Sequence, residues 1–121
     1  MSRDATDQIK RTVKWNLIRG NTPDTLNMKL EFSMLKEELN EAVNHTDEAN
    51  LFKELLDLQF VLLGTLGKMN LSAEQITEGY EAVLCSNETK SSTKNAEGKI
   101  TKPADFVNPE PQLQVILDER N

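Results

Sequence analysis

The sequence predicts an all-α protein: an antiparallel helical bundle of about four helices, completed by oligomerisation and followed by an irregular C-terminal tail. Apolar residues recur at helical spacing in four segments, and short breaks containing Gly, Pro or Asn separate these segments. The length of 121 residues suits one domain with a modest core. We therefore predict a single domain over residues 1–121, with a helical core at about 4–88 and a polar tail at about 91–121.

The first helix is predicted at about residues 4–18, where Ile9, Val13 and Leu17 form one narrow apolar stripe. The break that follows contains the usual signals for ending one helix and starting another. Its signal residues are Gly20 as a C-terminal cap, then Thr22 and Pro23 as the cap and first turn of the next helix.

The second helix, predicted at about residues 23–45, has acidic residues beside its apolar face. The apolar stripe consists of Met28, Phe32, Leu35, Leu39 and Ala42. The neighbouring stripe consists of Glu31, Met34, Glu38, Glu41 and His45. A short break with Thr46 or Asp47 as an N-cap then implies an antiparallel hairpin with the next helix.

The third helix, predicted at about residues 48–69, is apolar on almost every side. Its main stripe consists of Leu51, Leu55, Leu58, Leu62, Leu66 and Met69, and further apolar residues follow from Leu56 onward. A helix of this kind must be covered on several sides, and in so small a chain a second copy of the protein would supply part of that cover. We therefore expect a homodimer or a homotetramer.

The fourth helix is predicted from Ser72, where Gln75 completes a capping-box pattern, to about Asn87. Residues 91–111 are rich in Lys, Thr, Asn, Gly and Pro, which is typical of a loop or an arm. The last residues are expected to close the chain with one short helix or strand.

Composition excludes several classes of function. Twenty acidic residues against fourteen basic ones give a net charge of -6, which argues against binding a nucleic acid polymer. The single cysteine, Cys85, fits a reducing compartment. The N-terminus lacks the apolar core of a signal peptide, and no apolar run is long enough to span a bilayer. We expect a cytoplasmic protein that does not bind membranes.

Two acidic pairs are the strongest functional signal. Glu38 and Glu41 lie three residues apart on the second helix, and Glu54 and Asp57 lie three apart on the third. Both pairs are at similar distances from the turn, so an antiparallel hairpin would bring the four carboxylates to one patch. Their repulsion requires protonation or a cation, and ligands that are all oxygen favour Mg²⁺, with Mn²⁺ as a substitute.

Other interpretations of these acids remain open. The pairs could form a solvated or partner-binding surface of a noncatalytic helical module. Lys36 and Lys53 are near these acids in sequence, but from the helical spacing we expect neither lysine to lie on the acidic face. Di-iron bundles use Glu-x-x-His pairs, and the only histidine, His45, is expected to cap a helix end instead of binding metal.

The pattern "EELNE" followed by "ELLD" resembles the E-x-x-E and E-x-x-D signature of the MazG-like all-α nucleotide pyrophosphohydrolases. That superfamily includes MazG, dimeric dUTPases and phosphoribosyl-ATP pyrophosphohydrolase. The segments "SNETK" and "GKITKPADFVNPEP" are similar to the Ser-Asn-x-x-Lys motif and the tail of its members. The resemblance covers roughly residues 31–111.

The resemblance implies an enzyme that cleaves a nucleoside triphosphate between its α- and β-phosphates, giving a monophosphate and pyrophosphate. It implies Glu38, Glu41, Glu54 and Asp57 as magnesium ligands and Glu37 as a residue that orients a ligand or the attacking water. The residues that it implies for the sugar and phosphates are Asn87, Lys90, Lys99 and Lys102.

The base of the nucleotide is not identified by any motif. Trp15, the only tryptophan, is a candidate for stacking on a base, with burial in a subunit interface as the alternative. Asn16 beside it has the hydrogen-bonding groups to read a base. A general house-cleaning enzyme for (d)NTPs, a dUTP hydrolase and a phosphoribosyl-ATP hydrolase all remain open.

Overall fold

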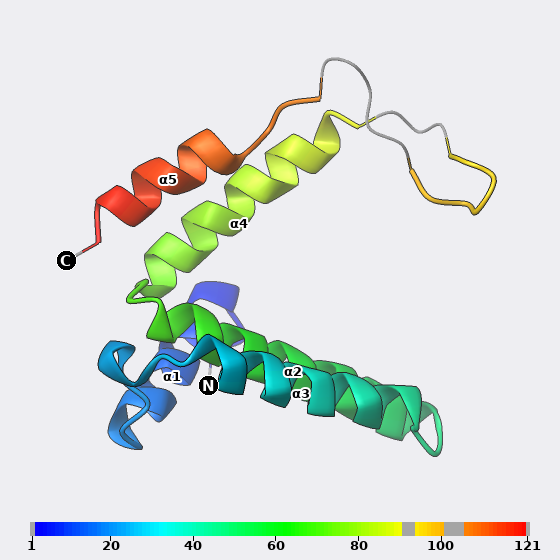
Figure 1. Cartoon of the computed structure of the whole chain (residues 1–121), viewed down its shortest axis with the longest axis horizontal. Coiled ribbons are helices and arrows are strands. Elements are labelled where there is room, and N and C mark those ends of the chain that lie inside the picture. The colour runs from blue at the N-terminus through cyan, green and yellow to red at the C-terminus, as the bar shows by residue number, and fades with distance from the viewer. Residues whose placement is uncertain (1, 91–93, 101–105, 121) are drawn as a thin grey trace. The chain divides into compact units, whose positions relative to one another are not determined.

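The computed structural model describes residues 2–90, 94–100 and 106–120. Within these ranges it contains five α-helices, one 3-10 turn and no strand, apart from an isolated bridge between Lys94 and Ile100, so the all-α prediction is confirmed (Figure 1). The elements are α1 (Ala5–Ile18), η1 (Pro23–Thr25), α2 (Met28–Val43), α3 (Glu48–Lys68), α4 (Ala73–Glu88) and α5 (Glu110–Asp118).

The chain divides into two compact units, Met1–Ala73 and Glu74–Asn121. In the first, α3 packs against α2, α1 and η1. None of the helices in the described part of the chain is long and apolar enough to cross a membrane.

The α2/α3 hairpin is the scaffold of the first unit, and its turn forms as predicted (Figure 1). The Asp47 side chain accepts a hydrogen bond from the backbone N–H of Asn50 at 2.8 Å, and the Asn50 side chain accepts one from the N–H of Thr46 at 3.0 Å. The first of these bonds satisfies an amide that the first turn of α3 cannot bond internally, and the second fixes the residue that precedes the N-cap. The ring Nδ1 of His45 lies 2.8 Å from the carbonyl oxygen of Ala42, the helix-end role expected for it.

The second helix begins later than predicted. Pro23 starts only a single 3-10 turn, in which the Thr22 hydroxyl donates to the Asp24 side chain and makes no cap hydrogen bond to the backbone. Leu26 is extended, and α2 starts at Met28 with Asn27 as its N-cap. Gly20, by contrast, follows α1 with a φ of 81°, as a C-terminal glycine should.

The acidic stripe of α2, and not its apolar stripe, contains the most deeply buried residue. Glu31 is only 1% exposed. The residues Met28, Phe32 and Leu39 of the apolar stripe are exposed within the single chain, as are Leu55 and Leu62 of α3. Three of these residues line an open groove of about 600 Å³, which we call the apolar groove. The groove is lined by Phe32, Leu35, Lys36, Leu39, Leu58 and Leu62.

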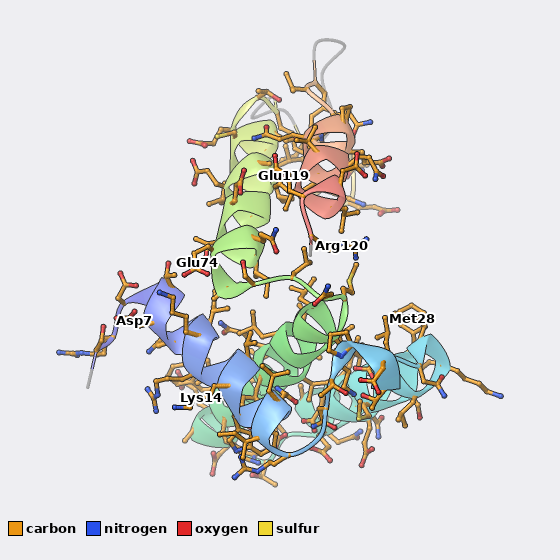
Figure 2. All side chains as sticks on the ribbon, turned by 90° about the vertical axis from the view of Figure 1, so that its left-hand side faces the viewer. Asp7, Lys14, Met28, Glu74, Glu119 and Arg120 are labelled. Atoms are coloured by element: carbon orange, nitrogen blue, oxygen red, sulfur yellow. The ribbon has the colours of Figure 1, made fainter. Side chains whose placement is uncertain are left out.

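The second unit contains α4 and α5, which run side by side in both views (Figures 1 and 2). A Cβ placed on Gly79 of α4 would lie 3.4 Å from the Leu113 side chain of α5, and Ile116 is buried. The final segment was expected to be a short helix or strand, and the structure shows a helix.

The chain between these helices is tied to the end of α4. The hydroxyl of Ser86 donates to the Val107 carbonyl at 2.5 Å, and the N–H of Val107 donates to the Thr89 hydroxyl at 3.3 Å. Within the intervening stretch, a turn over residues 94–100 is closed by Asn95 and by Gly98 with a φ of 82°.

Candidate metal and substrate site

Three of the four predicted ligand carboxylates lie together on the α2/α3 hairpin. Glu38 and Glu41 project from successive turns of α2, and Glu54 projects from the first half of α3. One carboxylate oxygen from each lies within 4.8 Å of the other two. We call this group the acidic cluster.

The acidic cluster contains two buried carboxylate oxygens that receive no hydrogen bond from the described part of the chain. Glu54 is 7% exposed, and its Oε1 receives hydrogen bonds from Asn50 Nδ2 at 3.3 Å and Lys53 Nζ at 3.4 Å. The Oε2 atoms of Glu38 and Glu54 are buried, and neither has a hydrogen-bond partner among the described residues. A buried carboxylate oxygen without a partner is costly, so these atoms favour either a proton or a cation.

The electrostatics of Glu41 support the same conclusion. The neighbouring charge of Glu38 raises the pKa of Glu41, and the adjacent Glu54 side chain raises it further. The charge of Glu37 adds to this effect, so Glu37, which is exposed on α2, lies close enough to influence the cluster. Without a cation, Glu41 therefore holds a proton more readily than an isolated carboxylate does.

The fourth predicted ligand, Asp57, is not part of the acidic cluster in this structure. Its carboxylate lies 2.9 Å from Lys53 Nζ, and its side chain is 41% exposed. The expectation that Lys53 does not share the acidic face was wrong. Lys53 precedes Asp57 by four residues, a spacing that places both on one helix face, and its flexible side chain also reaches Glu54.

The predicted base-binding residues lie at the opposite end of the hairpin, where α1 packs on α3. Trp15 makes an edge-to-face contact with Phe60 at 5.1 Å, and the Arg19 guanidinium lies 4.2 Å from the Trp15 ring. Asn16 is 9% exposed; its side chain donates to the Thr12 carbonyl and accepts from Asn21 Nδ2.

These residues border a pocket of about 290 Å³, which we call the polar pocket. The residues that line it include Trp15, Asn16, Asn21, Glu31, Phe60 and Lys68.

The polar pocket has a buried ion pair in its wall that the sequence interpretation missed. Lys68 Nζ lies 3.0 Å from Glu31 Oε2, and the Thr65 hydroxyl donates to Glu31 Oε1 at 3.0 Å. Side chains on a helix lean toward its N-terminus, so Lys68 and Glu31 reach toward each other across the antiparallel pair. The sequence did contain a signal for this pair, because Lys68 lies at helical spacing on the same stripe of α3 as Glu54 and Asp57.

The residues implied for the sugar and phosphates belong to the second unit. Asn87 Nδ2 donates to the Val83 carbonyl of its own helix at 2.9 Å, and Lys90 Nζ lies 5.7 Å from the centre of the Phe106 ring. Lys99 lies on the turn of residues 94–100, and its N–H donates to Asn95 Oδ1. Lys102 lies outside the described residues.

Comparison with known protein families gives a match to the central part of the chain. The family model of phosphoribosyl-ATP pyrophosphohydrolase matches residues 19–82, more than half of the chain and the whole of the α2/α3 hairpin. No curated protein and no solved structure matches the chain. The chain belongs to the phosphoribosyl-ATP pyrophosphohydrolase family, within the MazG-like all-α pyrophosphohydrolase superfamily.

Proposed function

We propose that this protein is a cytoplasmic, Mg²⁺-dependent pyrophosphohydrolase that cleaves (d)NTPs between the α- and β-phosphates, giving a nucleoside monophosphate and pyrophosphate, and so removes unwanted nucleotides. Family membership supports hydrolysis of a phosphoric anhydride in general. The observation that carries the metal-dependent reaction is the acidic cluster, in which two buried carboxylate oxygens have no partner among the described residues.

The donor set fits a hard divalent cation. All candidate ligand atoms are carboxylate oxygens, from Glu38, Glu41 and Glu54, and oxygen ligands suit Mg²⁺ or Mn²⁺ better than Zn²⁺. Asp57 would complete the set if its carboxylate left Lys53. When bound, the metal supplies positive charge that joins the acidic protein to an anionic phosphate chain and stabilises the leaving pyrophosphate.

The residues of the chain have separate roles in this proposal. Glu37, exposed next to the acidic cluster, orients a ligand or accepts the proton of the attacking water. Lys90, Lys99 and Lys102 offset phosphate charge, and Asn87 binds the sugar or a phosphate. For this the Asn87 amide would exchange its bond to the Val83 carbonyl for one to the nucleotide.

We further propose that the protein acts as a homodimer or homotetramer. The apolar groove and the exposed apolar side chains beside it lie on the helices that also carry the acidic cluster. A second copy would remove this apolar surface from water.

A second candidate substrate is phosphoribosyl-ATP, because the matching family model describes hydrolases of that compound. It contains the same triphosphate-derived anhydride, so the acidic cluster would serve equally well. dUTP is a further specialised candidate within the superfamily. The competing non-enzymatic interpretation is a helical interaction module whose acids contact a partner.

The test is release of pyrophosphate from a panel of canonical and modified (d)NTPs and phosphoribosyl-ATP, with Mg²⁺, with Mn²⁺ and with EDTA. We expect metal-dependent release from at least one compound, and the preferred compound assigns the specialisation. Release from none of them would refute the enzymatic proposal. Thermal stability distinguishes the enzyme from the non-enzymatic module, because Mg²⁺ stabilises the folded protein only where that protein contains a metal site.

A further inference from the structure

The polar pocket and the acidic cluster lie along one face of the α2/α3 hairpin. Glu31 precedes Glu38 by seven residues, which is two helical turns or about 10 Å along α2. On α3, residues 54, 57, 61, 64 and 68 follow the same helical stripe. A nucleotide whose phosphates lie at the acidic cluster can therefore extend its sugar and base toward the polar pocket.

The size and lining of the polar pocket suit a planar heterocycle. Its volume of about 290 Å³ is at the lower end of the range for small-molecule sites, roughly 300–1,000 Å³, and suits a base better than a whole nucleotide. Trp15 and Phe60 offer aromatic surface, while Asn16 and Lys68 offer polar atoms. Gly64 leaves space for the Asn16 amide, since a Cβ there would lie 3.3 Å from its Nδ2.

The buried polar groups of the pocket have unused hydrogen-bonding capacity, mostly as donors. The Lys68 ammonium has three N–H donors, and within the described part of the chain only Glu31 accepts from it. Lys68 is 7% exposed and lines the pocket. Asn16 keeps one N–H and one lone pair beyond its bonds to Thr12 and Asn21. Each oxygen of Glu31 already accepts a bond.

We propose that the polar pocket binds the base of the nucleotide, and that Lys68 and Asn16 select a base with a carbonyl oxygen where cytosine and adenine carry an amino group. A carbonyl oxygen accepts from the free donors of Lys68 and Asn16, whereas an amino group would direct N–H groups at a cation. Uracil, thymine, guanine and hypoxanthine have this carbonyl. The inference rests on the proposed function, since it takes the phosphates to lie at the acidic cluster.

Binding of the product monophosphates tests the pocket without requiring catalysis. Trp15 is the only tryptophan, so its fluorescence reports directly on the polar pocket. Titration with dUMP and with dCMP in the presence of Mg²⁺ should change this fluorescence, and dUMP should have a dissociation constant at least about tenfold lower. Asn16→Ala should raise the dUMP constant about tenfold and leave that of dCMP unchanged. Lys14→Met, an exposed change on the same helix, is the control (Figure 2).

Lys68 requires a paired substitution, because Lys68→Met alone leaves Glu31 buried without its cation. The double variant Glu31→Gln with Lys68→Met removes both charges and should reduce the preference for dUMP to near unity. Equal dissociation constants in the native protein, or no fluorescence change with either nucleotide, would overturn the proposal. So would a preference for dUMP that survives both Asn16→Ala and the double variant.

Hydrolysis separates this inference from the proposed function. We expect kcat/KM to favour dUTP over dCTP and dITP over dATP by at least about tenfold, with the difference in KM. Metal-dependent hydrolysis without these preferences would refute the base selection and leave the reaction standing. Discrimination between dUMP and dCMP in a protein that releases no pyrophosphate would support the base selection and refute the proposed reaction.

Discussion

Glu54 combines burial with charge more tightly than the other members of the acidic cluster. Its Oε1 is held by Asn50 and Lys53, while its Oε2 is buried and has no partner among the described residues. In the absence of a cation, this side chain therefore has two opposing effects. It holds a ligand oxygen in position, but it destabilises the fold by burying a negative charge.

Replacing Glu54 with Gln should separate these two effects. The amide keeps the shape and an acceptor for Asn50 but loses the charge, so we expect kcat to fall by about a hundredfold or more. The melting temperature of the metal-free protein should rise by a few degrees because the repulsion with Glu38 and Glu41 is removed. Steady-state assays and thermal unfolding in EDTA measure both.

Glu78→Gln, which neutralises an exposed acid on α4, is the matched control and should change neither quantity. Asp57→Asn should also abolish turnover if Asp57 joins the metal site during catalysis. An active Glu54→Gln enzyme would contradict the ligand role.

Glu41 makes the site sensitive to pH. Its pKa in the folded, metal-free protein lies above the ordinary 4.5, chiefly because of the Glu38 charge, so the folded protein binds a proton that the unfolded chain does not. As pH falls from the raised value toward 4.5, Glu41 therefore adds stability to the metal-free protein, and this contribution is lost again as pH rises. The same proton competes with the metal for the carboxylate.

Thermal unfolding with and without Mg²⁺ between pH 8 and about pH 5 should show this competition. The stabilisation by Mg²⁺ should shrink as pH approaches the raised pKa of Glu41. Glu38→Gln removes the main cause of the shift, so the gain in stability of the metal-free protein on lowering the pH should become smaller. A stabilisation by Mg²⁺ that is constant over the whole range would contradict this account.

Helical arithmetic predicted much of the site at this scale. Residues three apart on two antiparallel helices place Glu38, Glu41 and Glu54 together, and the structure shows this. The contact between Lys53 and Asp57 was missed, although its spacing was visible, because a long flexible side chain can reach either of two acids. Which carboxylate a lysine contacts depends on packing and solvent exposure that spacing does not define.

At the scale of the elements, a buried ion pair joins α2 to α3. Glu31 and Lys68 lie at the end of the hairpin far from its turn, and Thr65 adds a hydrogen bond. Both charged side chains are almost fully buried. Removing one charge leaves the other uncompensated, whereas removing both does not.

Lys68→Met should therefore lower the free energy of unfolding by about 3–5 kcal/mol. Combining Glu31→Leu with Lys68→Met should restore most of that loss. Urea unfolding followed by Trp15 fluorescence, which reports on this unit, measures both variants. A double variant as unstable as the single one would show that the pair contributes through its hydrogen-bond geometry and not through charge compensation.

The hairpin illustrates what sequence patterns define in an element and what they leave open. The turn at Asp47 and the end of α1 at Gly20 follow from local capping chemistry and were predicted. The start of α2 at Met28 was not predicted, because Pro23 can begin either a long helix or a single turn. The N-cap at Asn27 determines that α2 begins at Met28. The burial of Glu31 depends on Lys68, which is 37 residues away, so a local sequence pattern could not predict it.

At the scale of the whole molecule, a single chain leaves much apolar surface on α2 and α3 exposed. We expect light scattering or sedimentation equilibrium to give a dimer or tetramer. Leu39→Glu, on the apolar groove, should shift the protein toward the monomer, because a charge would be buried in the interface. In an isolated chain the same exposed change would alter the free energy of unfolding by at most about 0.5 kcal/mol.

Ile18→Glu, at the exposed end of α1, is the control for this test and should leave the assembly intact. A native protein that is monomeric at all concentrations would contradict the predicted assembly. It would also leave the apolar groove without an occupant. The prediction of a single domain over residues 1–121 stays a prediction.

Val107 makes two hydrogen bonds to residues at the end of α4, one with Ser86 and one with Thr89, and these bonds have a consequence for Lys99. A segment whose two ends are held together has less conformational entropy to lose than a free tail of the same length. Lys99 belongs to such an anchored segment. In our proposal that Lys99 offsets phosphate charge, part of the entropy cost of ordering this lysine would be met when the chain folds.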